Sequence, residues 1–435
     1  MRLPMGWAVT TLGECQGKTS NLDPRHFACE EFELFSVPSY SLYKPERVVG
    51  AEVGSTKQEL RPRDVLLCKI VPHIRRGWVV PAVSNKRQIG SGEWIVLRDH
   101  GLDPDFLRRF ILSDEFHREF MKTTSGVGGS LIRARPADAA KIAVPVPPTA
   151  EQRRIIAKLD ALTARIARAR AELDQVPALA RKIRESTVEG LISGRVKSWK
   201  KVSLETLLSA GPTNGWSPKS GPDASGTLTL KLTATTSGYL RTDKAAVKRI
   251  YETVPEDSNL WLEPGDLLIQ RANALEHVGA AAVFAGQRKS FIYPDLMMRV
   301  RIPDQHLTKL VWYQLRSPTV RQYFRDHATG TAGNMPKISG STVRKVPIWV
   351  PPDDQVKDVV THMDRTFARA ERLEAEAARA RKLLDRLESA ILAKAFRGEL
   401  VPQDPNDEPA EMLLERIRAE REAAPKPKRG RRAAS

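Results

Sequence analysis

Residues 143–148 read Ala-Val-Pro-Val-Pro-Pro, and residues 347–352 read Pro-Ile-Trp-Val-Pro-Pro. Each motif is followed by a long helical run that ends in glycine, at Gly194 and at Gly398. The motifs end 204 residues apart (352 minus 148), and so do the helical runs (398 minus 194). A period this long exceeds any stacked repeat, so the sequence predicts a duplicated unit made of a domain followed by a helix.

The two helical runs carry the pattern of a coiled coil. Their apolar residues alternate spacings of three and four, which favours helices that pack along a common seam. Each run is about 43 residues long, or roughly 65 Å of helix. Pro177 interrupts the first run, and because proline removes an intrahelical hydrogen bond we expect a kink or break there. The predicted seam positions are Leu159, Leu162, Ile166, Ala169, Leu173, Val176, Ala180 and Ile183, then Met363, Thr366, Ala370, Leu373, Ala377, Ala380, Leu384 and Leu387.

The segments outside the helical runs mix strand-like and helical patterns, which indicates α+β domains. The first run leads away from one domain, and the second satisfies the same seam most easily by packing back along the first. We therefore expect an α+β protein with two similar globular domains, separated by two long antiparallel coiled-coil helices and related by a pseudo-two-fold axis. The expected divisions are a first domain (1–148), a helix (149–197), a second domain (198–351), a helix (352–398), a docking segment (399–423) and a basic disordered tail (424–435).

Composition favours a polyanionic partner. The 435 residues include 70 Lys and Arg against 52 Asp and Glu, a formal charge of +18. The stretch 425–432 holds five positive charges and no acidic ones, so the rest of the chain still carries +13 (18 minus 5). Such a body attracts nucleic acid through phosphate neutralisation. An anionic membrane is the weaker alternative, since no long apolar span or basic amphipathic terminus is present.

The cysteines and the N-terminal sequence indicate the compartment. Cys15, Cys29 and Cys68 are odd in number and lack CxxC spacing, so they predict free thiols in a reducing environment. The first residues contain no apolar stretch long enough for a signal peptide. We expect a cytoplasmic protein.

Catalytic motifs are missing from the sequence. It has no GxxxxGK[ST] phosphate loop, no GxGxxG after a strand, no HExxH, no GxSxG and no Asn-Pro-Pro-aromatic motif. The eight histidines are scattered, without metal-ligand spacing. A non-catalytic protein that binds no cofactor or metal itself is the expected class.

Two loops in each domain are candidates for binding nucleic acid. A strand that begins Asp-hydrophobic-hydrophobic leads into a polar loop, and a glycine-containing loop follows the helical segment. Basic and amide side chains read base edges or contact phosphates, and small residues allow close backbone approach. The alternatives are an ordinary solvated loop and a tight turn. The candidates are Lys69, His73, Arg75, Arg76, Gly128 and Arg133 in the first domain, and Arg271, Asn273, Gly333, Asn334 and Lys337 in the second.

The chain resembles the specificity subunits of type I restriction–modification systems. The motifs that carry the resemblance are Val-Pro-Val-Pro-Pro-Thr-Ala-Glu-Gln at 144–152, Ile-Ile-Ala-Lys-Leu-Asp at 155–160, and Ala-Lys-Ala-Phe-Arg-Gly-Glu-Leu-Val-Pro at 393–402. The stretch 404–418 is similar to the usual C-terminus of that family. The second half departs from the pattern, because its motif continues Asp-Asp-Gln355 in place of Thr-Ala-Glu-Gln. Helix entry can therefore differ between the halves.

The resemblance implies a DNA-binding subunit without catalytic activity of its own. Each domain would be a target-recognition domain that reads one half of an asymmetric bipartite site in double-stranded DNA, and the helices would set the spacer. Two methyltransferase (modification) subunits would dock along the helices and flip an adenine from each half-site. Endonuclease/translocase (restriction) subunits would join them. S-adenosylmethionine, ATP and Mg would bind to these partners, and candidate docking residues are Glu151, Gln152, Gln355 and Phe396.

Three other functions stay open at this point. An enzyme that methylates or cuts DNA alone requires a catalytic motif that the sequence lacks. A coiled-coil scaffold that binds proteins with both domains explains the seams but not the basic body. A stand-alone DNA-binding regulator predicts tight specific binding without a methyltransferase.

Overall fold

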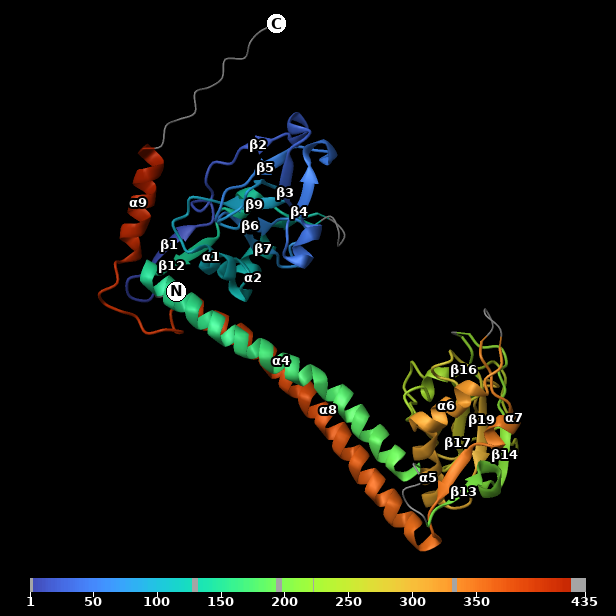
Figure 1. The fold of residues 1–435 in the computed structure, drawn as a ribbon. Helices are drawn as coiled ribbons and strands as arrows, with labels where there is room; N and C mark the ends of the chain where they lie inside the picture. The colour runs from blue at the N-terminus through green and yellow to red at the C-terminus, as the bar shows by residue number, and fades with distance from the viewer. Residues whose placement is uncertain (1–2, 127–131, 193–197, 222, 331–334, 424–435) are drawn as a thin grey trace. The chain divides into compact units, whose positions relative to one another are not determined.

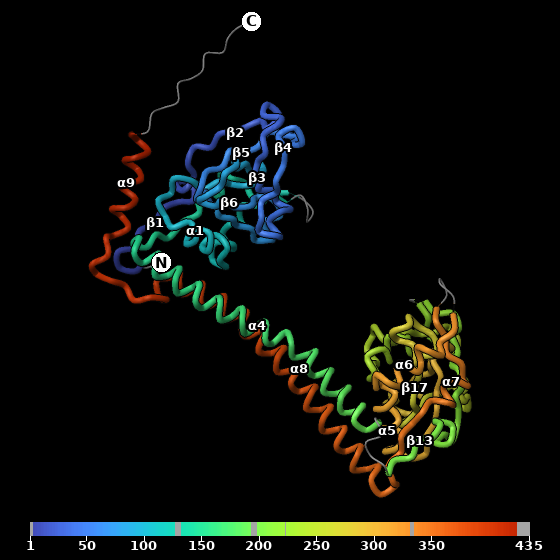
Figure 2. Tube along the Cα trace, viewed as in Figure 1, coloured from blue at the N-terminus to red at the C-terminus, as the bar shows by residue number. Residues whose placement is uncertain are grey.

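The computed structural model describes residues 3–126, 132–192, 198–221, 223–330 and 335–423. The chain divides into two compact units (Figure 1, Figure 2). Unit 1 holds Met1–Glu172 and Ala380–Ser435, and unit 2 holds Leu173–Arg379. Each unit contains a globular α+β head and about half of each long helix.

The head of unit 1 is built from small sheets and short helices. One sheet has the order β2 (Asn21–Leu22), β5 (Lys57–Glu59), β8 (Arg87–Gly90), β3 (Glu31–Phe35) and β4 (Glu46–Val49), and another has the order β7 (Gly77–Val79), β6 (Val65–Cys68) and β9 (Trp94–Leu97). Two-stranded pairs join β1 (Ala8–Thr11) with β12 (Ala143–Val146), and β10 (Thr124–Ser125) with β11 (Arg133–Ala134). The helices are α1 (Pro104–Ile111), α2 (Asp114–Lys122) and α3 (Pro136–Ala139).

The head of unit 2 repeats this plan. Its main sheet has the order β14 (Ala210–Asn214), β19 (Met297–Arg301), β17 (Leu267–Gln270) and β18 (Ala281–Val283). Two-stranded pairs join β13 (Lys200–Ser203) with β20 (Pro347–Val350), and β15 (Leu228–Leu230) with β16 (Val247–Arg249). The helices are α5 (Gln305–Leu315), α6 (Pro318–Asp326) and α7 (Gly340–Arg344).

The duplication predicted from the sequence is present in the elements themselves. The long helices α4 (Thr149–Ile192) and α8 (Asp353–Phe396) begin and end 204 residues apart (353 minus 149, 396 minus 192). The strands that precede them, β12 and β20, keep the same offset. Ser113 caps α2 and Ser317 caps α6, each hydroxyl accepting a hydrogen bond from the backbone N–H three residues on.

Within each unit, α4 and α8 run antiparallel. In unit 1, Arg170 Nη2 lies 2.7 Å from Asp385 Oδ1 and 2.8 Å from Glu388 Oε2. In unit 2, Arg184 Nη2 lies 2.6 Å from Glu374 Oε2. Residue numbers therefore rise along one helix as they fall along the other. The predicted fold class, α+β heads with two long antiparallel helices, is confirmed.

The seam between the helices is buried at alternate positions. On each helix, buried or half-buried seam residues recur every seven positions. The fully buried ones are Leu159, Ile166, Ala180, Met363, Ala370 and Ala377. The intervening positions are more open, and Ile183, Leu373 and Leu387 are exposed. Pro177 lies inside α4, which is continuous from Thr149 to Ile192, so the expected break is wrong. One lost backbone bond does not end a helix that packs along its partner on both sides of the proline.

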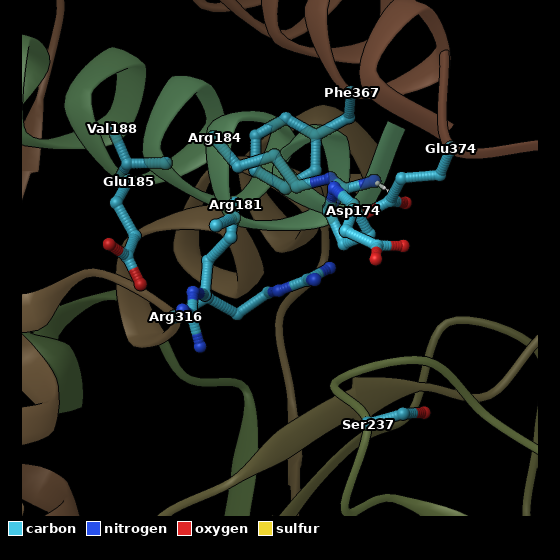
Figure 3. Close-up of a pocket in the computed structure, with 11 residues that line it drawn as sticks. Asp174, Arg181, Arg184, Glu185, Val188, Ser237, Arg316, Phe367 and Glu374 are labelled. Carbon is cyan, nitrogen blue, oxygen red and sulfur yellow. Dashed lines mark hydrogen bonds and ion pairs between the residues drawn. The ribbon is translucent and has the colours of Figure 1, made fainter. Parts of the chain in front are cut away.

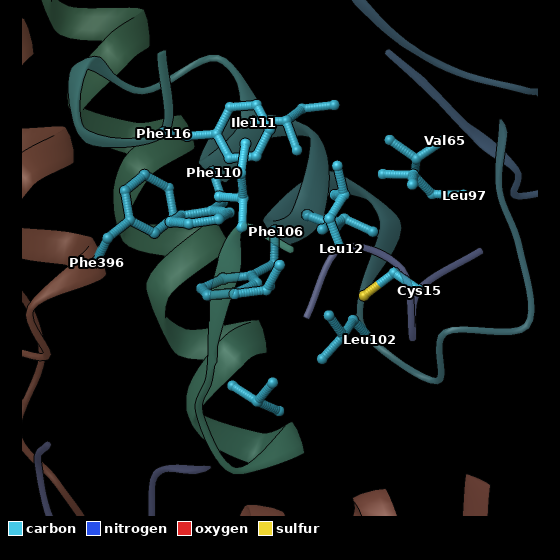
Figure 4. Close-up of a cluster of buried hydrophobic side chains, with 14 of the residues drawn as sticks. Leu12, Cys15, Val65, Leu97, Leu102, Phe106, Phe110, Ile111, Phe116 and Phe396 are labelled. Atoms are coloured by element: carbon cyan, nitrogen blue, oxygen red, sulfur yellow. The ribbon is translucent and has the colours of Figure 1, made fainter. Parts of the chain in front are cut away.

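The end of α8 completes the core of unit 1. Phe396 is fully buried, and its ring centroid lies 5.5 Å from that of Phe106 and 5.3 Å from that of Phe110 (Figure 4). The C-terminal helix α9 (Ala410–Ala423) packs on the same head, where its Leu414 joins the core. Ahead of α9, Asp407 pairs with Arg154 of α4 at 2.5 Å. The first head is thus built from both ends of the chain.

Among the described residues, no helix combines the length and the apolar character needed to cross a membrane.

Candidate nucleic-acid interface

A hairpin loop projects from the same strand pair in each head. In unit 1 the loop 69–76 joins β6 to β7, and in unit 2 the loop 271–280 joins β17 to β18. The strands that lead into these loops, β6 and β17, are completely buried, so the start of each loop is fixed by the core of its head. These are the loops that the sequence indicated as candidates.

An ion pair to a buried aspartate holds the start of each hairpin. Asp64 accepts hydrogen bonds from the Arg98 guanidinium at 2.9 and 2.6 Å, and both side chains are 2% exposed. Asp266 accepts from Arg301 at 2.6 Å in the equivalent place. Both aspartates also accept from a backbone N–H three residues earlier, which closes the turn into the strand. The aspartate of the sequence motif is therefore structural, and the arginine partners were not found from the sequence because they lie on distant strands.

In each head the hairpin loop is joined to the described C-terminal end of the second candidate loop. In unit 1, Ile70 is bridged to Arg133, and the Ala134 N–H donates to the Lys69 carbonyl at 2.8 Å. In unit 2, Ala272 is bridged to Lys337, and the Ile338 N–H donates to the Arg271 carbonyl at 2.9 Å. The structure thus joins, by the same backbone pairing in both heads, two segments that are far apart in the sequence.

Several candidate side chains on this surface are already engaged within the head. Arg75 donates to Asp114 at 2.5 Å, and Arg76 donates to the Ile70 carbonyl at 3.5 Å. Arg133 pairs with Glu93 at 3.2 Å. Each of these guanidinium groups is thus oriented by a partner in its own head and keeps further N–H donors that are not used there.

Asn273 is also used internally. Its Nδ2 donates to Gln270 Oε1 at 2.6 Å, and its Oδ1 accepts from the Ala274 N–H at 2.7 Å. Gln270 is fully buried and donates in turn to the Leu232 carbonyl at 2.8 Å. In this arrangement Asn273 holds the loop in shape, as expected for an amide that satisfies a local backbone group.

The remaining basic candidates are unengaged. Lys69, His73, Arg271 and Lys337 have side chains that make no hydrogen bond or ion pair with any residue the structure describes. Each head thus presents two such basic groups. Gly128, Gly333 and Asn334 lie outside the described residues.

Three of the four candidate docking residues are buried in unit 1. Glu151 accepts from the Trp7 indole at 3.0 Å, and burial raises the pKa of its carboxyl above the usual range. Gln152 accepts from the Asp103 N–H at 2.8 Å and donates to the Pro147 carbonyl at 2.9 Å. Phe396 lies in the core described above, whereas Gln355 is exposed. These three buried residues attach α4 and α8 to the first head. Their role in docking a partner stays a prediction, and their burial does not favour it.

Helix entry does differ between the halves, as the degraded motif suggested. The offset of 204 places Val356 where the first half has Gln152. Val356 packs with Leu310 and Val360, so an apolar contact replaces the hydrogen bonds of the glutamine. Another buried amide, Gln314, holds the neighbouring strand of unit 2 by donating to the Trp349 carbonyl at 2.7 Å and accepting from its N–H at 2.9 Å.

Unit 2 contains a cavity of about 590 Å³ between its head and its parts of α4 and α8 (Figure 3). Arg316 lies against the Tyr239, Trp312 and Phe367 rings, 4.3 to 5.2 Å from their centroids. The lining carries three arginines and three carboxylates, so its formal charges balance. These charged residues are Arg181, Arg184, Arg316, Asp174, Glu185 and Glu374.

Metal-ligand groups are not found in the described residues: no three His, Cys, Asp or Glu side chains converge on one point. The three cysteines are free thiols, of which Cys15 and Cys68 are buried. Burial raises the pKa of Cys15 to about 12, so this thiol is not poised to act as a nucleophile.

The comparisons with known proteins agree with the resemblance seen in the sequence. The chain is 28% identical over 340 residues to the specificity subunit of the type I restriction enzyme EcoKI of Escherichia coli K12, covering 73% of this chain and 72% of the relative. It is 25% identical over 340 residues to the StySPI specificity subunit of Salmonella potsdam, covering 74% and 72%. The resemblance to type I restriction enzyme specificity subunits is confirmed by these relatives. No protein-family model matches the chain.

Solved structures share the fold. The crystal structure of the HsdS subunit from Thermoanaerobacter tengcongensis aligns with a TM-score of 0.66 at 22% identity, over 92% of this chain and 99% of that one. A chain from a study of complex assembly and conformational transition of the type I R-M system aligns with a TM-score of 0.69 at 22% identity, over 92% and 100%. The whole architecture, and not one head alone, is therefore shared.

Proposed function

We propose that this chain is the DNA sequence-specificity subunit of a type I restriction–modification complex and has no catalytic activity of its own. The observation that carries the proposal is the repeated surface, in which the same hairpin and the same second loop are bridged in both heads. Two equivalent reading surfaces on one chain fit a bipartite DNA site. The sequence relatives, which are named as specificity subunits, support the same role.

Each head would read one half of the target. The halves differ at the hairpin base, where unit 1 has Cys68-Lys69 and unit 2 has Gln270-Arg271, so the target should be asymmetric. Phosphate contacts from the unengaged basic groups would position each head, and base contacts would specify the sequence. The charge of +18 supports attraction to duplex DNA.

The long helices would set the spacer and receive two methyltransferase subunits. Exposed apolar side chains along them support a docking role, because an isolated antiparallel pair would gain little from presenting such residues to water. These are Leu179, Ile183 and Leu373 in unit 2, and Leu383 and Leu387 in unit 1. The chemistry would belong to the partners, with S-adenosylmethionine on the methyltransferase subunits and ATP and Mg on the restriction subunits. Such a complex would act in the cytoplasm, where the chromosome lies.

The test is methylome sequencing of the source cell with and without the gene for this chain. The proposal predicts that one gapped, asymmetric motif, methylated on both strands, disappears when the gene is removed. A methylome that does not change, combined with failure of the full chain to co-purify with a methyltransferase, would contradict the proposal.

A further inference from the structure

Each of the two hairpin loops carries an exposed aliphatic side chain, which hydrogen bonding to base edges does not explain. Ile74 lies near the tip of the loop 69–76, and Leu275 lies near the tip of the loop 271–280. Each side chain is 47% exposed, and neither takes part in any of the hydrophobic core clusters of the described residues. Single exposed apolar residues are common on protein surfaces, but these two occupy the same loop of both heads.

The backbone that carries each of these side chains is fixed by hydrogen bonds within its head. The Ile74 N–H donates to the Val71 carbonyl at 3.0 Å, and the Val71 N–H donates across to Ile132 of the second loop at 2.9 Å. In unit 2, the Val278 N–H donates to the Ala274 carbonyl at 3.1 Å, so Leu275 lies within a closed turn. A loop whose backbone is already fixed loses little backbone freedom on binding, which favours a specific contact.

The surroundings of each side chain favour a nucleic-acid partner. Ile74 stands beside the unengaged His73, and the unengaged Arg271 and Lys337 lie at the base of the loop that carries Leu275. Three of the polar candidates on these loops, Arg75, Arg76 and Asn273, are engaged inside the heads. What each loop presents is thus a basic group for a phosphate and a half-exposed aliphatic side chain.

On a base edge, the partner of an aliphatic side chain is the thymine methyl group. In the major groove the other groups of the four base pairs are hydrogen-bond donors and acceptors, which an aliphatic side chain cannot satisfy. The C5-methyl of thymine is the apolar exception. We propose that Ile74 and Leu275 each contact the methyl group of a thymine in their own half-site, and so determine part of the sequence specificity. This inference rests on the proposed function.

The test compares thymine with deoxyuridine, which differs only in lacking the methyl group. The full chain, in complex with its methyltransferase partner, is titrated with duplexes of the methylome-derived target in which each thymine is replaced singly. One thymine in each half-site should be sensitive, and its replacement should weaken binding about fourfold, the loss of one buried methyl-sized contact. Ile74→Ala should remove the sensitivity in one half-site only, and Leu275→Ala in the other only.

Two further variants separate a specific contact from a general defect. Val83→Ala, at a highly exposed residue of the first head outside the hairpin, should leave both sensitivities intact. Ile74→Val should retain most of the sensitivity that Ile74→Ala loses. Sensitivity that survives in both alanine variants, or binding that weakens equally for thymine and deoxyuridine, would overturn the inference while leaving the proposed function standing. A wild-type complex that binds no duplex would overturn both.

Discussion

Arg98 shows how much one residue can decide inside a head. Its guanidinium pairs with Asp64 and also donates to the carbonyls of Lys18 and Glu59, at 3.0 and 2.8 Å. Removing one partner of a buried ion pair leaves an uncompensated charge, which typically costs about 3–5 kcal/mol. Arg98→Ala should therefore lower the free energy of unfolding by that order, measured by urea denaturation.

The matched control is Lys122→Ala, because Lys122 and Glu119 form an ion pair on the surface of α2. Exposed pairs contribute little, so this variant should unfold close to wild type. If Arg98→Ala were as stable as Lys122→Ala, the buried pair would not support the hairpin as argued.

The buried His100 side chain should make the stability of the first head depend on pH. Burial, followed by the nearby Arg63 and Arg421 charges, lowers its pKa from 6.5 to about 4. Between these values the unfolded chain binds a proton that the folded chain resists, so folding stability falls as pH drops from about 6.5 to about 4. The loss at pH 4.5 should be roughly 2 kcal/mol, since one pKa unit corresponds to about 1.4 kcal/mol.

The measurement is urea denaturation at pH 7 and pH 4.5 for wild type and His100→Gln. The variant lacks the titrating group, so its stability should fall less than that of wild type over this range. Equal losses in the two proteins would assign the acid sensitivity to other groups.

At the residue scale, the sequence predicted where the loops are but not what their side chains do. The Asp-hydrophobic-hydrophobic motif located both hairpins, because a buried strand followed by polar residues is a local signal. The partners of Arg75, Asn273 and Arg133 depend on residues such as Asp114 and Glu93, which only the folded head brings near. For the same reason, the burial of Glu151 and Gln152 could not be predicted from their motif.

At the scale of elements, the end of α8 is the clearest case of a helix that stabilises a distant head. Phe396→Ala should destabilise unit 1 by about 3–5 kcal/mol, because the deletion leaves a cavity among Phe106 and Phe110. Leu387→Ala, on the same helix but largely exposed, should change stability far less. Thermal unfolding of the two variants side by side provides the measurement. Similar shifts in both would mean that α8 does not complete the core.

Ion pairs between α4 and α8 exchange their charges between repeat-equivalent positions. In both units the arginine is on α4 and the carboxylates are on α8: Arg184 meets Glu374 in unit 2, and Arg170 meets two carboxylates in unit 1. The offset of 204 relates Glu374 to Arg170 and Arg184 to Glu388, so the same pair is reversed. The ion pair between these two equivalent positions therefore forms whichever of the two carries the arginine.

A charge reversal in unit 2 tests that statement. Arg184→Glu alone places two carboxylates together and should destabilise the chain by about 1 kcal/mol, and adding Glu374→Arg should restore most of the loss. Denaturant unfolding of the single and double variants gives the coupling energy. If the double variant were no more stable than Arg184→Glu alone, the two charges would not be interchangeable.

The element scale is also where sequence patterns were most informative. The three-four spacing predicted both long helices, because a seam repeats over many turns and tolerates local exceptions. Pro177 was overestimated as a breaker, since local propensity yields to packing along a partner helix. The open seam positions Ile183 and Leu373 could not be distinguished from buried ones, because the spacing does not reveal which faces the partner covers.

For the molecule as a whole, the duplication is the property that could be predicted most directly from the sequence. The long helices, the strands before them and the helix caps repeat at a constant offset. The internal similarity of the sequence therefore predicted that a domain and a helix follow one another twice. In the proposed function, the target bases are contacted by loop side chains that differ between the heads. Duplication predicts two reading surfaces and cannot predict what each one reads.

The central claim is that each head reads its own half of a bipartite site. The most direct measurement is the methylome of cells that express, with the methyltransferase partner, a chain whose residues 198–351 are replaced by a copy of residues 1–147. This chain carries the hairpin and the recognition loops of the first head twice, so the asymmetric motif should be replaced by a gapped palindrome made of one original half-site and its inverse. Methylation that keeps the original asymmetric motif would contradict the claim that the heads carry the specificity.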